Sequence, residues 1–240
     1  AKLESAMDEE TAAIMLTNPN TLGMFEKDIL KICEIVHKKG GLVYCDGANL
    51  NAIMGIVKMG NMGIDVLHIN LHKTFSTPHG GGGPGAGPVC IKDILEPYLP
   101  APIVEKAGSK YKLNADRPDS VGRLKSFNGN FGMLLRAYAY IRTLGPEGIR
   151  EAARSAVLNA NYIRAKLKDT FHLPFTGASL HECVFNDKGQ GITTMDFAKA
   201  LIDHGFHPPT VYFPLIVKGA LMIEPTETES KEPLDNFIAT

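Results

Sequence analysis

The sequence lacks an excess of charge of either sign. Its 25 Lys and Arg residues almost balance its 26 Asp and Glu residues, which gives a formal net charge of -1. Proteins that bind nucleic acid need clustered Lys and Arg to neutralise phosphates, and proteins held electrostatically on anionic lipid need a basic surface. The balance therefore argues against both classes, and we expect neither a nucleic-acid partner nor a membrane partner.

Long hydrophobic runs and paired cysteines are also missing. No uncharged apolar stretch approaches the roughly 18 residues of a membrane-spanning helix, and the N-terminal Ala1-Lys2-Leu3-Glu4 lacks the basic-then-apolar pattern of a secretory signal. The 4 cysteines form no CxxC pair, which excludes zinc-ribbon and thioredoxin-type motifs. Sparse cysteine favours a reducing compartment, so we expect a cytoplasmic protein. We expect no metal site, because His68 and His72 on one strand would lie too far apart to chelate one ion.

The residues that are present have the composition of an ordinary globular protein. Hydrophobic residues make up 44% and charged residues 21% of the 240 residues, enough for one large domain or two small ones. Apolar runs predict strands at residues 12–16, 42–45, 66–71 and 88–91. Helical spacing predicts helices at residues 29–36 and 51–58 between them. Strands that alternate with helices predict an α/β fold with a parallel-rich sheet.

The pattern becomes mainly helical after about residue 130. One helix is predicted over residues 133–144, and Pro146 suits the first turn of a second that runs to about Asp169. Further strands are predicted at 181–185 and 220–223, a helix at 194–204, and a solvated acidic segment at 224–232. We therefore expect an incomplete large domain over residues 1–145 and a smaller α+β C-terminal domain over residues 146–240.

Two charged side chains follow strands that are consecutive in the sequence. Asp46 comes directly after one strand and Lys73 comes just after the next. Ligands of open α/β sheets bind at such strand ends. Alone, an Asp there is more often a turn or cap residue, and a lone Lys is usually a solvated surface charge. Together they match pyridoxal phosphate (PLP), which needs a lysine for its Schiff base and an acid partner for its pyridine nitrogen.

Three neighbouring residues complete the predicted cofactor site. The small Ala48 would let the PLP ring lie flat against the backbone, and Asn70 and His72 flank the lysine, where they would donate to the phosphate or orient the imine. We therefore predict Lys73, Asp46, Ala48, Asn70 and His72 as cofactor-binding residues. Of these, Lys73 and His72 are the predicted catalytic residues.

Longer strings around these residues resemble a known family. Asp46-x-Ala48 followed by Asn70-x-His72-Lys73 is similar to the fold-type I PLP-dependent transferases, particularly their decarboxylase branch. Strings that resemble the glycine cleavage system P-protein, the decarboxylating glycine dehydrogenase, lie at residues 46–52, 68–75, 78–88, 125–130 and 221–230. The resemblance covers nearly the whole chain and indicates a C-terminal fragment of the family's second, catalytic subunit.

The resemblance implies an oxidoreductase of glycine catabolism whose substrate is glycine. Lys73 would carry PLP, the glycine carboxylate would leave as CO2, and the ring together with Asp46 would stabilise the remaining carbanion. The carbon would then pass, as an aminomethyl group, to the lipoyl arm of the H-protein. The implied partners are the lipoylated H-protein and either subunit 1 of the P-protein or a second copy of the chain.

A glycine-rich run follows the predicted lysine. Gly80-x-Gly82-x-x-Gly85 matches the dinucleotide-binding fingerprint, with Glu105 at about the expected distance. That fingerprint must open a helix, whereas Pro84 interrupts this run and a strand is predicted after it. No Gly-Lys-Ser/Thr follows to make a phosphate loop. A flexible surface linker and a loop at the mouth of the site remain, and we favour a loop that admits the lipoyl arm.

Two alternatives to the glycine-cleaving enzyme stay open. The first is another fold-type I PLP decarboxylase or lyase that acts on a different amino acid, which would need no lipoylated carrier. The second is a truncated, non-catalytic fragment, because the residues before Asp46 contain no Gly-Ser/Thr phosphate motif. The last arginine, Arg164, precedes most of the predicted small domain. This suits a decarboxylase, since a tight ion pair would stabilise the substrate carboxylate in its ground state.

Overall fold

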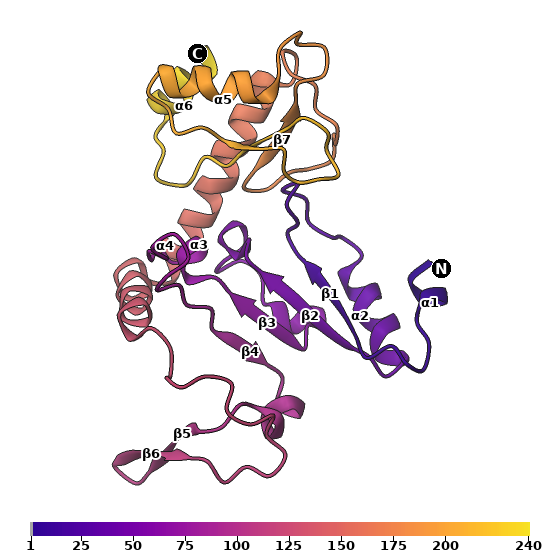
Figure 1. The fold of residues 1–240 in the computed structure, drawn as a ribbon, viewed down its shortest axis with the longest axis vertical. Helices are drawn as coiled ribbons and strands as arrows, with labels where there is room; N and C mark the ends of the chain where they lie inside the picture. The colour runs from indigo at the N-terminus through magenta and orange to yellow at the C-terminus, as the bar shows by residue number, and fades with distance from the viewer. Residues whose placement is uncertain (1) are drawn as a thin grey trace.

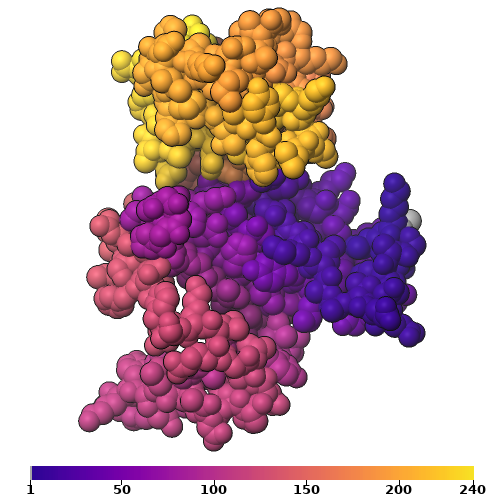
Figure 2. Space-filling model, in the orientation of Figure 1, coloured from indigo at the N-terminus to yellow at the C-terminus, as the bar shows by residue number. Residues whose placement is uncertain are grey.

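The computed structural model describes residues 2–240. Figure 1 shows a central sheet, a C-terminal lobe at one end of it and a β-hairpin at the other, with one long helix running up into the C-terminal lobe. In the space-filling view the orange and yellow C-terminal lobe sits directly on the purple N-terminal part (Figure 2). Among the helices of residues 2–240, none combines the length and the hydropathy needed to cross a bilayer.

The central sheet has four strands in the order β1-β2-β3-β4. The strands are β1 (Ala13–Thr17), β2 (Leu42–Gly47), β3 (Val66–Ile69) and β4 (Val89–Ile91). The first three are parallel, which confirms the parallel-rich sheet, whereas β4 is antiparallel to β3. Parallel strands need a crossover, usually a helix. Only one helical turn and the glycine-rich run separate β3 from β4, so the chain returns in the opposite direction.

The helix α2 (Ile29–Lys38) covers one face of this sheet. Its Ile29, Cys33 and Val36 are buried in one cluster with Val43 and Cys45 of β2. The short helix α1 (Lys2–Ala6) contacts α2 near the N-terminus. This amphipathic pattern was readable from sequence because its apolar residues recur at helical spacing.

The helix predicted over residues 51–58 is wrong. The chain forms two short 3-10 turns instead, η1 (Leu50–Ala52) and η2 (Met59–Met62). Gly55 has φ of 70°, outside the right-handed helical region, and therefore interrupts any helix there. The strand predicted to reach residue 71 also ends earlier, because Asn70 begins the single helical turn α3 (Leu71–Thr74).

A hairpin that the sequence reading missed projects from the sheet (Figure 1). It follows η3 (Asp93–Tyr98) and consists of β5 (Ile103–Ala107) paired antiparallel with β6 (Lys110–Asn114). Val104, Tyr111 and Leu113 are exposed on it. Its lysines interrupt the apolar runs, so no continuous strand signal appears.

The long helix α4 (Phe131–Leu167) is two helices joined by a kink. Gly145 has φ of 62° and ψ of -176°, and Pro146 starts the second segment, as predicted from the Gly-Pro pair. The second segment buries a face made mostly of small residues: Ala153, Ala156, Ala160, Ile163 and Leu167. The division into domains after Gly145 stays a prediction.

The C-terminal lobe has a three-stranded antiparallel sheet in the order β7-β9-β8. Its strands are β7 (Cys183–Asn186), β8 (Thr210–Val211) and β9 (Ala220–Ile223). Its helices are α5 (Thr194–Asp203) and α6 (Lys231–Ala239), and its core surrounds the fully buried Phe185. The strand predicted over residues 181–185 starts two residues late, because His181 and Glu182 precede β7. Thr193 and Asp196 form a capping box that begins α5.

Candidate functional site

Asp46 is the second-last residue of β2, where the N–H of Ala48 and the ring of His68 hold its carboxylate. Its Oδ1 accepts the backbone N–H of Ala48 at 2.8 Å and lies 2.9 Å from Nε2 of His68. The side chain is 25% exposed, so its second oxygen, Oδ2, remains available to a further donor. The carboxylate is thus fixed in position at the carboxyl end of a parallel strand, as the sequence predicted.

The sequence reading missed His68 as the residue that orients Asp46. The parallel register pairs Asp46 with His68, which brings the two side chains together on adjacent strands. Nδ1 of His68 lies 2.8 Å from the hydroxyl of Tyr44, two residues before Asp46 on the same face of β2. The pair lies between parallel strands, so only the strand register could have revealed it.

Lys73 and His72 lie in α3, just beyond the end of β3. The backbone N–H of Lys73 donates to the carbonyl of Asn70 at 3.1 Å, and the Lys73 side chain is exposed. The ring of His72 meets that of His79 edge to face, with centroids 4.8 Å apart. Burial lowers the pKa of His72, and the neighbouring positive charges of His79 and Lys73 lower it further. Nδ1 of His72 has no hydrogen-bond partner.

Asn18, which was not predicted as a site residue, lies at the same edge of the sheet as Asp46. It follows β1, whose last residue pairs with Asp46 in the parallel register. The side chain is buried at 1% exposure, and its Oδ1 accepts the N–H of Glu26 at 2.9 Å. Its Nδ2 has no partner. A buried amide donor is costly to leave unpaired, so Asn18 is suited to donating to a ligand.

Ala48 and Asn70 are placed at the strand ends, as their sequence positions require. Ala48 is buried at 9% exposure, two residues after the Asp46 carboxylate that holds its N–H. Asn70 is partly buried and starts α3 without a side-chain capping bond. Whether either residue touches a cofactor remains a prediction.

The glycine-rich run forms an ordered loop beside His72. Gly80, Gly81 and Gly82 all have positive φ, and the N–H groups of Gly82 and Gly83 donate to the carbonyl of His79. Nδ2 of Asn130 donates to the carbonyl of Gly85 at 2.8 Å, which ties the loop to the start of α4. The run leads into β4 and opens no helix, so it does not have the geometry of the dinucleotide-binding motif.

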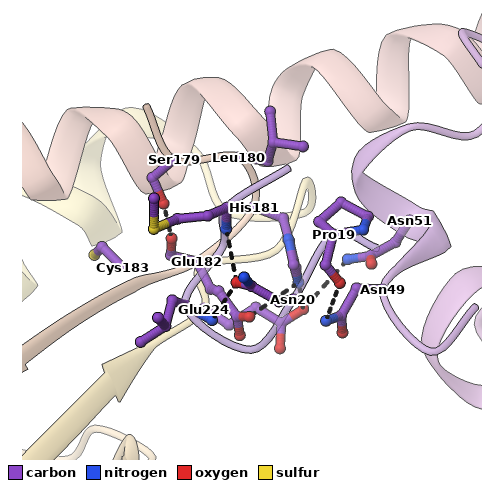
Figure 3. Close-up of polar contacts among 12 residues, drawn as sticks. Pro19, Asn20, Asn49, Asn51, Ser179, Leu180, His181, Glu182, Cys183 and Glu224 are labelled. Carbon is purple, nitrogen blue, oxygen red and sulfur yellow. Dashed lines mark hydrogen bonds and ion pairs between the residues drawn. The ribbon is translucent and has the colours of Figure 1, made fainter. Parts of the chain in front are cut away.

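A second cluster of titratable side chains lies where the C-terminal lobe meets the strand ends (Figure 3). His181 and Glu182 precede β7 and Glu224 follows β9. Nε2 of His181 lies 3.6 Å from Oε1 of Glu182 and 3.9 Å from Oε1 of Glu224. Nδ2 of Asn51, in the turn after Asp46, donates to Oε1 of Glu224 at 3.2 Å.

We call His181, Glu182, Glu224 and Asn51 the junction cluster. Burial sets the charge states of its titratable members. Burial lowers the pKa of His181 to about 4, with the charge of Lys73 acting in the same direction. Burial also raises the pKa of Glu182 to about 8, and the negative charge of Glu224 raises it further. At pH 7 both neighbours are neutral, so their approach is not an ion pair.

Most of the acidic segment over residues 224–232 is exposed, as predicted, but Glu224 also contacts other members of the junction cluster. Its side chain is 43% exposed, yet desolvation by the surrounding atoms raises its pKa, against the lowering effects of the Asn51 hydrogen bond and the Lys73 charge. The rest of the segment also contacts another part of the protein, since Asn159 donates to the carbonyls of Thr226 and Glu229. The charge-rich composition hid these contacts.

Two other features do not join the strand-end site. A cavity of about 350 Å³ in the C-terminal lobe is lined by Phe206, His207 and Leu234, and it shares only Glu224 with the junction cluster. Among residues 2–240, no group of three or more His, Cys, Asp or Glu side chains is arranged to hold a metal ion.

Two families match different parts of the chain. The family described as "Glycine dehydrogenase, C-terminal domain" matches residues 152–240, and that described as "Aminotransferase class-V" matches residues 1–101. The first covers the C-terminal lobe and most of the second segment of α4, and the second covers the central sheet.

Curated relatives match over the whole length of the chain. Proteins named glycine dehydrogenase (decarboxylating) subunit 2 are 58% identical in Listeria innocua over 100% of the chain and 57% identical in Bacillus licheniformis over 99%. The protein of the same name in Staphylococcus haemolyticus is 59% identical over 98% of the chain. The chain spans about half the length of these relatives, 50%, 50% and 49% respectively.

Solved structures share the fold. A glycine decarboxylase (P-protein) of the glycine cleavage system, in inhibitor-bound form, superposes with a TM-score of 0.81 at 24% identity, over 97% of this chain and 55% of that one. A cysteine desulfurase from Thermococcus onnurineus superposes with a TM-score of 0.73 at 18% identity, over 99% of this chain and 60% of that one. At these identities the likeness establishes the architecture, and it confirms the predicted fold-type I class.

Proposed function

We propose that this chain, which is similar over nearly its whole length to proteins named glycine dehydrogenase (decarboxylating) subunit 2, carries the PLP-attaching part of an enzyme that decarboxylates glycine and passes the aminomethyl group to the lipoyl arm of the H-protein. The placement of two side chains is the observation that supports this proposal most directly. Asp46 and Lys73 lie at the ends of neighbouring parallel strands, and Asp46 is held by two donors with one oxygen to spare. We propose a cytoplasmic location, which the absence of disulfides among the cysteines supports.

The unpaired polar atoms at this edge fit a phosphorylated pyridine ring. Asn18 Nδ2, His72 Nδ1, Thr74 Oγ1 and Thr77 Oγ1 are all buried without partners. An amide donor suits a ring hydroxyl and threonine hydroxyls suit phosphate oxygens. When bound, PLP supplies an electron-withdrawing ring that makes the loss of CO2 from glycine feasible.

The chain's own residues would act on that ring from fixed positions. Lys73 would supply the nitrogen that attaches the cofactor, and Oδ2 of Asp46 would accept a hydrogen bond from the protonated pyridine nitrogen. His68 would keep Asp46 oriented, because its Nε2 donates to Oδ1 when Nδ1 accepts a hydrogen bond from the hydroxyl of Tyr44. Asn70, Ala48 and His72 would line the remaining side.

Partners are proposed on the same basis. The exposed apolar side chains of Phe131, Leu135 and Tyr138 on the first segment of α4 suit a protein surface, either subunit 1 or a second copy of the chain. The loop of Gly80–Gly87 is proposed to shape the entrance for the lipoyl arm.

Visible absorption tests the cofactor proposal. PLP added to the natural full-length protein, with its partner subunit where it has one, is expected to give a visible band that Lys73→Ala abolishes. Lys58→Ala is the matched control, because Lys58 is exposed in the same part of the chain and makes no ion pair. A band that survives in Lys73→Ala refutes the assignment.

Isotope exchange tests the reaction and the carrier. Labelled CO2 is expected to enter the carboxyl group of glycine only when lipoylated H-protein is present. Exchange without the carrier, or decarboxylation of a different amino acid instead of glycine, would support another PLP decarboxylase.

A further inference from the structure

His79, the residue before the glycine-rich run, has no part in the cofactor proposal. Its side chain is exposed, yet two contacts fix its ring. The N–H of Gly82 donates to Nδ1 of His79 at 3.1 Å, and the ring meets that of His72 edge to face, with an interplanar angle of 75°. An exposed side chain ordinarily changes rotamer within nanoseconds. The two contacts therefore indicate that the orientation of this ring serves a purpose.

The glycines fold the loop back onto His79. The N–H groups of Gly82 and Gly83 also donate to the carbonyl of His79, at 2.9 and 2.7 Å. This reversal uses φ values of 57°, 69° and 113° at Gly80, Gly81 and Gly82, which residues with a Cβ rarely adopt. Because a backbone N–H can only donate, Nδ1 of His79 accepts from Gly82, and the ring carries its proton on Nε2. The loop thus selects one orientation and one tautomer of the ring.

His72 is confined by both ends of this loop. The ring of His79 lies against it at the first end, with the centroids 4.8 Å apart. At the other end, a Cβ at Gly85 would lie 3.9 Å from Nδ1 of His72 and 3.5 Å from Cβ of His79. Nδ2 of Asn130 donates to the carbonyl of Gly85 and holds this end in place. The His72 ring therefore has little freedom to turn, although its Nδ1 makes no hydrogen bond.

Two threonine hydroxyls on the same short segment are also unpaired. Oγ1 of Thr74 and Oγ1 of Thr77 are buried without partners, as is Nδ1 of His72. Hydroxyl groups and an imidazole N–H are donors that suit the oxygens of a phosphate. A hydrogen bond weakens steeply when it bends, so a donor must keep its direction to hold such an anion. The orientation of His72 is therefore expected to affect how firmly a phosphate is held.

We propose that His79 is a positioning residue, which holds the His72 imidazole in the direction of the cofactor phosphate. This inference rests on the proposed function, in which PLP occupies this edge of the sheet. It gives the glycine-rich loop a second task beside shaping the entrance. The Gly82 N–H holds His79, and the ring of His79 in turn holds His72.

Two variants of His79 separate the ring contact from the hydrogen bond. His79→Asn retains an acceptor for the Gly82 N–H but lacks the ring, whereas His79→Phe retains a ring and lacks the acceptor. PLP binding is followed by visible absorption in the natural full-length protein. It is expected to weaken about threefold to tenfold in His79→Asn, the effect of one ordinary hydrogen bond, and less in His79→Phe. His204→Asn is the matched control, because His204 is exposed in the C-terminal lobe.

Pyridoxal, which lacks the phosphate, shows whether the effect acts at the phosphate. The visible band that it forms is expected to need the same concentration in wild type and in His79→Asn. Equal weakening of PLP and pyridoxal overturns the proposal, because it indicates a general distortion of the site. A greater loss of PLP affinity in His79→Phe than in His79→Asn also overturns it, since PLP binding would then depend on the fold of the loop and not on the ring contact.

NMR of the cofactor-free protein tests the ring contact without PLP. With nitrogen-15 in the histidine rings, His72 is expected to show one tautomer in wild type and in His204→Asn. In His79→Asn it is expected to show a mixture, because a ring that turns samples both tautomers. An unchanged His72 overturns the proposal even where PLP binds, whereas a wild type without any visible band counts against the proposed function, so the two failures are distinguishable. His79 is exposed, so its variants leave the hydrophobic core intact.

Discussion

Gly23, in the loop after β1, lies very close to the segment before β7. It has φ of +73°, and a Cβ at this position would lie 2.3 Å from the carbonyl oxygen of Glu182 and 2.4 Å from Oγ of Ser179. Gly23→Ala therefore perturbs the seam between the C-terminal lobe and the sheet beside the buried side chain of Glu182.

The cost of this substitution has two separable parts. A left-handed conformation costs an L-residue about 1–2 kcal/mol. Forcing an extra methyl group into a packed contact costs about 1–3 kcal/mol more. The expected loss is then about 2–5 kcal/mol, a large share of the roughly 5–15 kcal/mol by which a domain is stable.

Gly40→Ala is the matched control, because it isolates the conformational part. Gly40 ends α2 with φ of +81°, and a Cβ there would meet nothing within 4 Å. This variant is expected to lose only about 1–2 kcal/mol. Urea unfolding of both variants and wild type measures the difference from the midpoints, provided that the slopes agree.

Equal losses in the two variants would refute the reasoning, because the close contact would then contribute nothing. A second readout follows from the position of Gly23. Opening the seam admits water to Glu182, so the midpoint of its carboxyl titration is expected to fall from about 8 in Gly23→Ala and to stay unchanged in Gly40→Ala.

Three further predictions use charge and loop geometry. The folded protein keeps Glu182 protonated up to about pH 8, whereas in the unfolded chain this carboxyl ionises near pH 4.5. Wild type is therefore expected to lose stability relative to Glu182→Gln as the pH rises between those values, by up to about 1.4 kcal/mol per pH unit. Urea unfolding at several pH values measures this loss. Burial opposes ionisation of Asp65, yet hydrogen bonds from the Val43 N–H, His37 and Lys92 hold its pKa below the usual value. Asp65→Asn is therefore expected to cost about 3–5 kcal/mol at neutral pH, and the cost should shrink as pH falls below about 4, where the carboxylate of wild type is also lost. Gly83→Val is expected to slow lipoyl-dependent turnover while PLP absorption is retained, because a Cβ there would make only ordinary contacts, 3.7 Å from the carbonyl oxygen of Gly80 and 3.8 Å from that of His79. Equal loss of both would contradict a role at the entrance.

The parts of the site that could be predicted are those whose sequence signal lies within one continuous segment of the chain. A buried strand followed by Asp46, and the next strand followed by Lys73, locate two functional groups at one sheet edge, because parallel strands end on the same side. The Gly145-Pro146 break could be predicted for a similar reason, since both residues restrict the backbone locally. The failed helix over residues 51–58 shows the limit: one glycine with positive φ outweighed an apolar pattern.

The residues that were missed depend on contacts between distant segments. His68 acquires its partner from the register of β2 with β3, and the junction cluster forms only when segments near residues 23, 51, 181 and 224 meet. In sequence, Glu224 belongs to an acidic run and His181 to a predicted strand, so neither carries a local signal. Attachment of the proposed cofactor therefore depends on short strings at strand ends, whereas the pKa of Glu182 depends on how the C-terminal lobe packs against those ends. A substitution in that seam, such as Gly23→Ala, can alter the charge state of the site and leave Asp46 and Lys73 in place.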